Sequence, residues 1–203
     1  MTYAPSLTVS RKKVLVKGSD EQFRRMIYAL VQGVSRLSTF RDIFGRQIGV
    51  TPSQFAVLMS VAHCQGCSGV TIRGLADHAA MAATHVTTEV GKLKRKGLVL
   101  KKPSPNDGRS VLVLLTSKGE AAIDGLVPFM RSVNDALFKE LDAATMKTVY
   151  EFSKRLLINA EAAMVEVRKR EMESEMQPTR TALRRSPAVQ EVVQPRGRLQ
   201  RRL

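Results

Sequence analysis

Residues 98–119, which read LVLKKPSPNDGRSVLVLLTSKG, constrain the fold more than any other part of the chain. Two short runs of β-prone residues, 98–100 and 111–115, flank a loop that holds two prolines, the triplet Asn-Asp-Gly and several cations. This pattern predicts a β-hairpin with a long, basic, exposed tip. The preceding segment, residues 82–97, has the period of a helix and becomes basic toward its end.

A basic helix followed at once by a charged hairpin is the arrangement of a winged helix-turn-helix. Such a helix fits a major groove of DNA, and the hairpin reaches an adjacent groove. The sequence therefore predicts a mainly α fold with a small β-wing, in which a winged helix-turn-helix lobe is joined to long terminal helices.

Charge supports a nucleic-acid partner. The chain has 33 Lys and Arg against 18 Asp and Glu, a net charge of +15, with a pI near 10.4, which is typical of proteins that bind polyanions. The excess lies in residues 1–19, 92–109 and 176–203, and the remainder is slightly acidic. No large apolar residues lie opposite the patch at 92–109 for insertion into lipid. We therefore expect double-stranded DNA as the partner and no membrane.

The pattern divides the chain into three parts. Residues 1–19 are predicted to be a basic, disordered arm, and residues 166–203 a charged and then basic disordered tail. Between them, residues 20–165 form one domain, with terminal helices at about 20–46 and 117–165 around a DNA-binding lobe at about 51–116.

Capping residues mark where helices begin. Thr51, followed by Pro52 and Gln54, predicts a capping box at a helix start. Further predicted caps are Asp20, Thr71, Ser117 (with Glu120 in a second capping box) and Asp142.

The terminal helices carry long apolar stripes, which a lobe of this length cannot cover alone. We expect them to pack against a second copy of the chain in a two-fold dimer. A dimer of this kind places two recognition helices in successive major grooves of a palindromic site.

The helix before the hairpin is the predicted recognition helix. Val86, Val90 and Leu93 recur at helical spacing and form its buried stripe, which turns the polar side chains outward. The alternative is an ordinary solvated helix face and loop. The predicted DNA contacts are Thr84, His85, Thr87, Thr88, Lys92, Lys94, Arg95, Lys101, Lys102, Asp107 and Arg109.

The chain resembles the MarR family of transcriptional regulators. The matching residues are Thr71, Leu75 and Ala76, the run from Thr84 through Leu93 to Val99, Asp107-x-Arg109, and Leu115-Thr116-x-x-Gly119. The resemblance implies a dimeric winged helix, usually a repressor, whose wing arginine (here Arg109) enters the minor groove while Asp107 holds it. It also implies release from DNA by a small molecule or an oxidant. Gly108 and the two basic tails depart from the family pattern.

Cys64 and Cys67 form a C-x-x-C pair next to His63. A helix C-terminus disfavours the thiolate, and too few further ligands are available for zinc, so we favour ordinary buried cysteines over a redox or metal site. No catalytic motif is present, and we expect no enzyme activity, no cofactor and no metal. No signal peptide or membrane span is predicted, which favours a soluble, cytoplasmic protein.

The predicted function is that of a homodimeric, sequence-specific DNA-binding regulator that represses transcription and is released by an effector. The alternative is an architectural, nucleoid-type protein that binds DNA with little sequence preference. A small aromatic effector is expected between the first, second and fifth helices. Its predicted lining is Leu37, Phe40, Phe44 and Phe55, although these side chains have an equal claim to be core packing.

Overall fold

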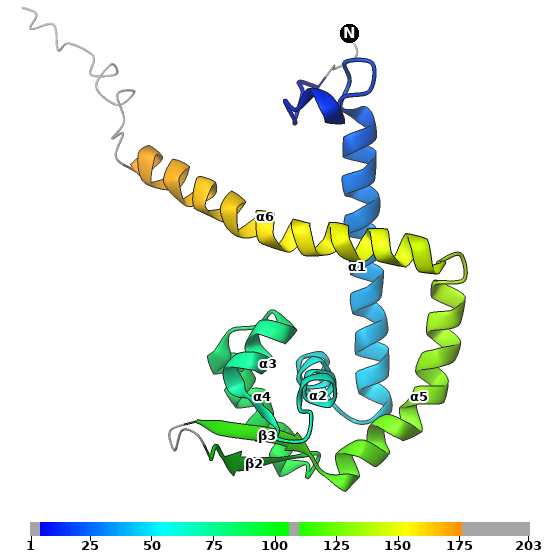
Figure 1. Ribbon diagram of the computed structural model, residues 1–203, viewed down its shortest axis with the longest axis vertical. Coiled ribbons are helices and arrows are strands. Elements are labelled where there is room, and N and C mark those ends of the chain that lie inside the picture. Colours follow the sequence, from blue (N-terminus) through cyan, green and yellow to red (C-terminus); the bar gives the residue numbers. More distant parts are fainter. Residues whose placement is uncertain (1–4, 106–109, 176–203) are drawn as a thin grey trace, which may run out of the picture. The chain divides into compact units, whose positions relative to one another are not determined.

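The computed structural model describes residues 5–105 and 110–175 (Figure 1). The chain divides into two compact units, the first ending at Lys139 and the second beginning at Glu140. The first holds a short 3-10 helix at Lys12–Val14, then α1 (Glu21–Gln47), α2 (Pro52–Cys64), β1 (Val70–Thr71), α3 (Ile72–Ala79), α4 (Ala83–Arg95), β2 (Val99–Pro103), β3 (Val111–Leu115) and α5 (Ser117–Leu137). The second holds α6 (Ala143–Glu175).

The three strands form one antiparallel sheet in the order β1-β3-β2. In the hairpin, Val99 pairs with Leu115 and Pro103 with Val111. Figure 1 shows this hairpin beside α2, α3 and α4. The mainly helical fold with a small β-wing is therefore confirmed.

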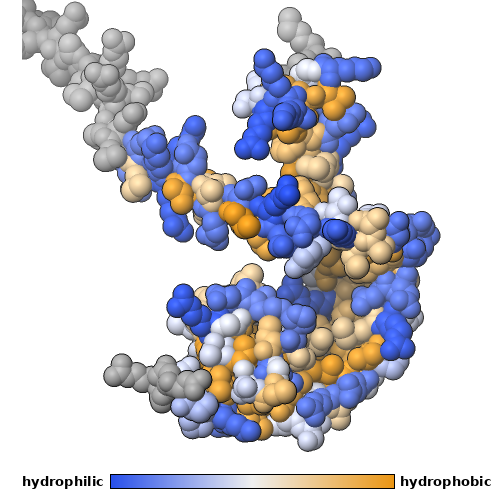
Figure 2. Space-filling view, viewed as in Figure 1, coloured by the Kyte–Doolittle hydropathy of each residue, from blue (hydrophilic) through white to orange (hydrophobic). Residues whose placement is uncertain are grey.

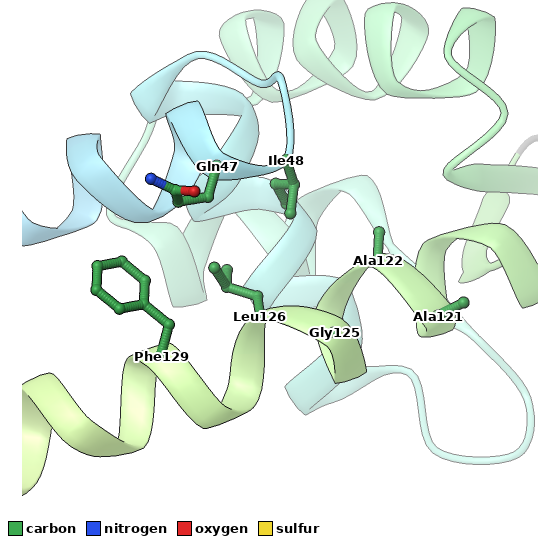
Figure 3. Close-up of a pocket in the computed structure, with 7 residues that line it drawn as sticks. All are labelled: Gln47, Ile48, Ala121, Ala122, Gly125, Leu126 and Phe129. Atoms are coloured by element: carbon green, nitrogen blue, oxygen red, sulfur yellow. The ribbon is translucent and has the colours of Figure 1, made fainter.

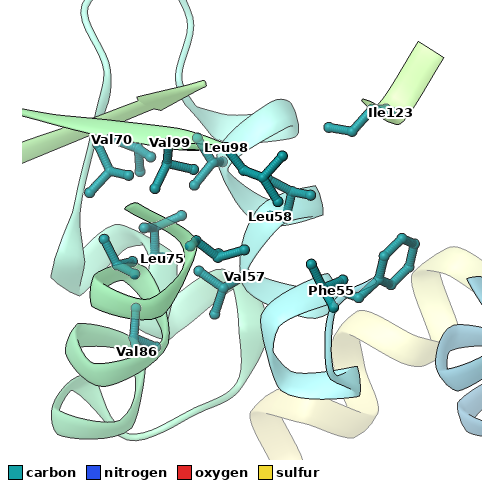
Figure 4. Close-up of a cluster of buried hydrophobic side chains, with 14 of the residues drawn as sticks. Phe55, Val57, Leu58, Val70, Leu75, Val86, Leu98, Val99 and Ile123 are labelled. Carbon is teal, nitrogen blue, oxygen red and sulfur yellow. The ribbon is translucent and has the colours of Figure 1, made fainter. Parts of the chain in front are cut away.

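One apolar core holds this lobe together (Figure 4). Each helix of the lobe supplies side chains with no exposed surface, and the sheet closes the cluster with Val113. Burying a side chain of this size contributes about 1.5–3 kcal/mol. The fully buried helical residues are Val57, Leu58, Val61, Leu75, Val86, Val90 and Leu93.

Helix starts in the lobe follow the predicted caps. The Thr51 side chain accepts from the Gln54 backbone N–H, and the Gln54 side chain accepts from the Thr51 N–H, so the capping box is present. Thr71 accepts from the Gly74 N–H at the start of α3. At the start of α6, Asp142 accepts from the Thr145 N–H at 2.7 Å.

Two predicted caps are wrong. Thr116, and not Ser117, caps α5, because its hydroxyl accepts from the Gly119 N–H at 3.0 Å. Asp20 precedes α1 without capping it. Instead, the buried Asp20 carboxylate accepts from both the backbone N–H and the hydroxyl of Thr8, and it also bonds to Arg24.

Both tails contain more structure than the sequence predicted. Residues 5–19 include the 3-10 helix, and the bonds from Thr8 to Asp20 tie them to the start of α1. At the other end, α6 continues through 166–175, which were predicted to be disordered. The predictions for residues 1–4 and 176–203 lie outside the described residues.

The long helices keep large apolar side chains on their open surfaces. In α1 only Phe44 and Gly45 are buried, and in α6 no residue is. Figure 2 shows apolar side chains among charged ones along the surface of α6. No helix in the described part of the chain is both long and apolar enough to cross a membrane.

Candidate DNA-binding interface

The recognition helix α4 is fixed from its inner side. Val86, Val90 and Leu93 have no exposed surface, as the predicted stripe requires. Because these three lie on one face, the opposite face is open to a partner. Among the predicted contacts on it, Thr84, His85, Thr87 and Thr88 are exposed, Lys92 is half-buried, and Lys94 and Arg95 are exposed at its C-terminal end.

Two hydroxyls on this face are bonded back to the helix. Thr87 donates to the carbonyl of Ala83 at 2.8 Å, and Thr88 donates to that of Thr84 at 3.1 Å. Their oxygens keep lone pairs that can accept from base amino groups, which adenine and cytosine present in the major groove. This arrangement suits hydrogen-bond acceptance better than donation.

Glu89 is the residue of this helix that the sequence analysis missed. The residue is 4% exposed, and its side chain turns toward α2, where Gln54 donates to Glu89 Oε2 at 3.1 Å. Glu89 Oε1 accepts from Lys92 at 2.7 Å and lies 3.5 Å from His85 Nε2. The spacing of His85, Glu89 and Lys92, at i, i+4 and i+7, is a signal that could have revealed the cluster.

The Glu89 carboxylate is ionised at neutral pH. Burial opposes the charged form, but hydrogen bonds from Lys92 and Gln54, together with the charge of Lys92, hold the pKa of Glu89 below its usual value. Two of the predicted DNA contacts therefore share a buried anion.

The two lysines of the wing do not point the same way. Lys101 pairs with the fully buried Val113, whereas the next residue, Lys102, pairs with Leu112 and is exposed. Successive side chains of a strand lie on opposite faces, so both cannot reach the same phosphate row. Lys102 is the better placed of the two for DNA.

The wing continues beyond its strands. The Ser104 N–H donates to the Ser110 carbonyl at 2.9 Å, which closes the base of the loop. The predicted contacts Asp107 and Arg109 lie outside the described residues. The interpretation that they pair with each other remains a prediction.

Phe44 and Phe55, predicted to line an effector site, belong to the core. They are 6% and 4% exposed, and their ring centroids lie 6.1 Å apart. Leu37 is exposed and Phe40 is half-buried. The structure places these four residues along α1 and at the start of α2, and it gives the two buried rings a packing role.

A hollow of about 370 Å³ lies instead between the end of α1 and α5 (Figure 3). None of the four predicted residues lines it. Phe129, which does, contacts Phe44 edge-on with ring centroids 5.6 Å apart. The lining is Gln47, Ile48, Ala121, Ala122, Gly125, Leu126 and Phe129.

Cys64 is the last residue of α2, and Cys67 lies in the loop that follows. Cys64 is half-buried and Cys67 is exposed, so the prediction of buried cysteines is wrong for Cys67; both thiols are free. The rings of His63 and His78 lie 5.0 Å apart, and His78 Nδ1 is 2.9 Å from the Ser60 hydroxyl. Within the described ranges, no group of three or more His, Cys, Asp or Glu side chains could hold a metal ion.

Comparison with known proteins adds a family match over the lobe. A model of the MarR family matches residues 48–110. The transcriptional regulator MhqR of Bacillus subtilis is 28% identical over 112 residues, 55% of this chain and 75% of MhqR. The transcriptional repressor NicR of Pseudomonas putida is 30% identical over 74 residues, 36% of this chain and 47% of NicR. The structure of a mutant MarR from E. coli with operator DNA has 25% identity and a TM-score of 0.54, covering 68% of this chain and 94% of that one.

Proposed function

We propose that this chain, which matches the MarR family of transcriptional regulators over residues 48–110, binds a palindromic DNA operator as a homodimer and represses transcription. The observation that carries the proposal is the α4 face. It presents hydroxyls and cations outward from a fully buried apolar stripe, directly before a two-stranded wing. Phosphate contacts by the cations supply affinity, and contacts of α4 with base edges supply specificity.

Selection of bound duplexes from a random pool tests this proposal. We expect an enriched motif with two inverted half-sites whose centres lie about one helical turn apart. Strongly salt-dependent binding without an enriched motif would contradict it and would favour the architectural alternative, to which the exposed cations Arg11, Lys12, Lys13 and Lys17 of the N-terminal segment would then contribute.

Replacing Arg109 with alanine is expected to cost about 1–3 kcal/mol of operator affinity. An arginine beside Gly108 on a loop tip can enter a narrow minor groove of negative potential. Kd for the selected operator is measured at fixed salt. As a control, Lys102→Ala should weaken binding to all duplexes alike and reduce the salt dependence by about one phosphate contact. Unchanged operator affinity in Arg109→Ala would remove Arg109 from the interface.

Replacing Gly91 with alanine is expected to separate stability from DNA binding. A Cβ at Gly91 would meet nothing closer than Arg95 Nη1 at 4.0 Å, so alanine should stabilise the lobe by about 0.5–1 kcal/mol. Operator affinity should nevertheless fall about tenfold, because the added methyl lies on the face that approaches DNA.

The matched control is Gly125→Ala in α5, where a Cβ meets nothing within 4 Å. It should raise stability by a similar amount and leave operator binding unchanged. Thermal unfolding and operator titration of both variants decide the question. Equal operator affinity of Gly91→Ala and the wild-type protein would show that the α4 backbone does not approach DNA closely.

An effector, we further propose, is a small and partly apolar molecule that binds in the hollow between α1 and α5. Apolar pockets with a few polar groups are the usual form of such sites, and Gln47 supplies an amide here. A ligand there acts only if it binds one spacing of the two recognition helices better than another.

Aromatic acids screened against the operator complex test the effector proposal. Gly125→Leu should fill the hollow and weaken release about tenfold or more, without affecting operator binding. Phe44→Ala and Phe55→Ala are poor probes, because truncating a buried phenylalanine costs about 3–5 kcal/mol of stability. Release that is unchanged in Gly125→Leu would place the effector elsewhere.

A further inference from the structure

The recognition helix carries a buried negative charge beside one edge of its DNA-facing side. Both oxygens of Glu89 are engaged, Oε2 by Gln54 at 3.1 Å and Oε1 by Lys92 at 2.7 Å. Glu89 is 4% exposed, so water does not screen these contacts as it would on the surface. An acid at this position is unexpected, because a carboxylate beside a DNA groove repels phosphate.

The position of Lys92 on the helix explains what the acid does. Successive residues of an α-helix lie about 100° apart, which places Thr84, Thr88 and Arg95 at the centre of the exposed face. His85 and Lys92 lie at one edge of that face, next to Glu89. The Lys92 side chain is 41% exposed, and its ammonium group is directed to Glu89.

Gln54 gives the carboxylate a fixed place. It is the third residue of α2, and its side chain also closes the capping box on Thr51. Glu89 is therefore held to α2 through an element that is itself rigid. Lys92 and His85 are in turn oriented by an anion that cannot rotate away into solvent.

We propose that Glu89 is a specificity-determining residue, which withholds Lys92 from phosphate so that α4 depends on contacts with base edges. The inference deepens the proposed function and rests on it. Each lysine that contacts phosphate adds sequence-independent affinity and makes the slope of log K against log salt steeper by about 0.9. Because the carboxylate of Glu89 neutralises the ammonium group of Lys92, affinity for random DNA is lowered more than affinity for the operator.

A purely structural role for Glu89 predicts different results. If Glu89 only joins α4 to α2, its loss weakens binding to operator and random DNA equally, through lower stability. The effect of Lys92 substitution would then be the same whether or not Glu89 is present. A double-mutant cycle separates the two interpretations.

The experiment compares the full-length wild-type protein, Glu89→Gln, Lys92→Gln and the double variant. Each is titrated with the selected operator and with a random-sequence duplex over a range of salt concentrations. In Glu89→Gln we expect random-duplex affinity to rise about three- to tenfold at low salt, and the salt slope to steepen by about 0.9. Adding Lys92→Gln should reverse both changes, and Lys92→Gln alone should leave the slope unchanged.

Glu151→Gln on α6 is the matched control, since it removes one negative charge at a distance in sequence from the lobe and should leave the slope unchanged. The proposal is overturned if Glu89→Gln leaves the random-duplex slope unaltered, or if Lys92→Gln alone lowers the slope by about one contact. If Glu89→Gln does not fold, the salt dependence of random-duplex binding by Lys92→Gln is sufficient to test the proposal. A wild-type protein that does not prefer its operator would instead defeat the proposed function, which the same titrations reveal separately.

Discussion

Lysines placed at both Val149 and Leu156 of α6 are expected to give a folded monomer that binds a palindromic operator about 10²–10⁴-fold more weakly than the wild-type protein. These two side chains are 52% and 51% exposed and lie on the same face, seven residues apart. A helix of 33 residues in which none is buried needs another surface to cover its apolar side. A second copy of the chain supplies that surface in the proposed dimer.

The loss of affinity arises because the dimer joins two recognition helices, each of which contacts one half-site. When one recognition helix is bound, the other is held near its half-site at high effective concentration, and a monomer loses this advantage without losing any contact of its own. The wild-type protein should therefore sediment as a dimer at micromolar concentration.

Lysines at Ala144 and Ala162 provide the matched control for this prediction. They add the same charge to α6 on the side opposite Val149 and Leu156. They should leave both the dimer mass and the operator affinity unchanged. Sedimentation and operator titration measure the two properties. A wild-type monomer, or a Val149→Lys/Leu156→Lys variant that stays dimeric, would refute the assignment of this helix to the dimer.

Features that depend on neighbours in sequence could be predicted from the chain alone. The Thr51–Gln54 capping box is a local exchange of hydrogen bonds, and the buried stripe of α4 follows from helical period. The hairpin was evident because its two strands flank a single loop. For these elements the local preference and the tertiary structure agree.

Features that need a distant partner were missed. Asp20 is a residue type that often caps helices. Its carboxylate is instead bound by the N–H and the hydroxyl of Thr8, 12 residues away. From the sequence, Glu89 has the features of an exposed acid. In the structure it is bonded to Gln54, which lies 35 residues earlier in the chain. A local sequence pattern cannot show whether a side chain will make a long-range contact, cap a helix or stay in solvent. The free energy of a long-range contact depends on burial, which only the fold creates.

The cap of α5 shows how two adequate local signals are resolved. Ser117 and Thr116 can each cap a helix, and Ser117 has the additional glutamate of a capping box. The structure uses Thr116, whose hydroxyl also donates to the Gly97 carbonyl at 2.6 Å while its N–H donates to the Leu98 carbonyl at 3.1 Å. These two bonds join α5 to the segment between α4 and β2, and a cap at Ser117 would lack them.

Replacing Gly119 with alanine is expected to destabilise the lobe by about 3 kcal/mol, at the upper end of what overpacking usually costs. A Cβ at this position would lie 2.1 Å from the Leu98 carbonyl oxygen. That oxygen is backbone and already accepts from Thr116, so it cannot move aside like a flexible side chain. The first turn of α5 must separate from Leu98, which breaks the bonds that Thr116 makes there.

Denaturant unfolding of Gly119→Ala measures this cost, and Gly125→Ala on the same helix is its control. Gly125 has open space around it, so the control isolates helix propensity and should be slightly stabilising. Operator affinity of Gly119→Ala should also fall, because Gly97 and Leu98 directly follow α4 and fix where its basic end lies. A Gly119→Ala protein as stable as the Gly125→Ala control would mean that the contact between α5 and Leu98 is looser than the structure has it. The Leu115-Thr116-x-x-Gly119 pattern would then need an explanation other than this close backbone approach.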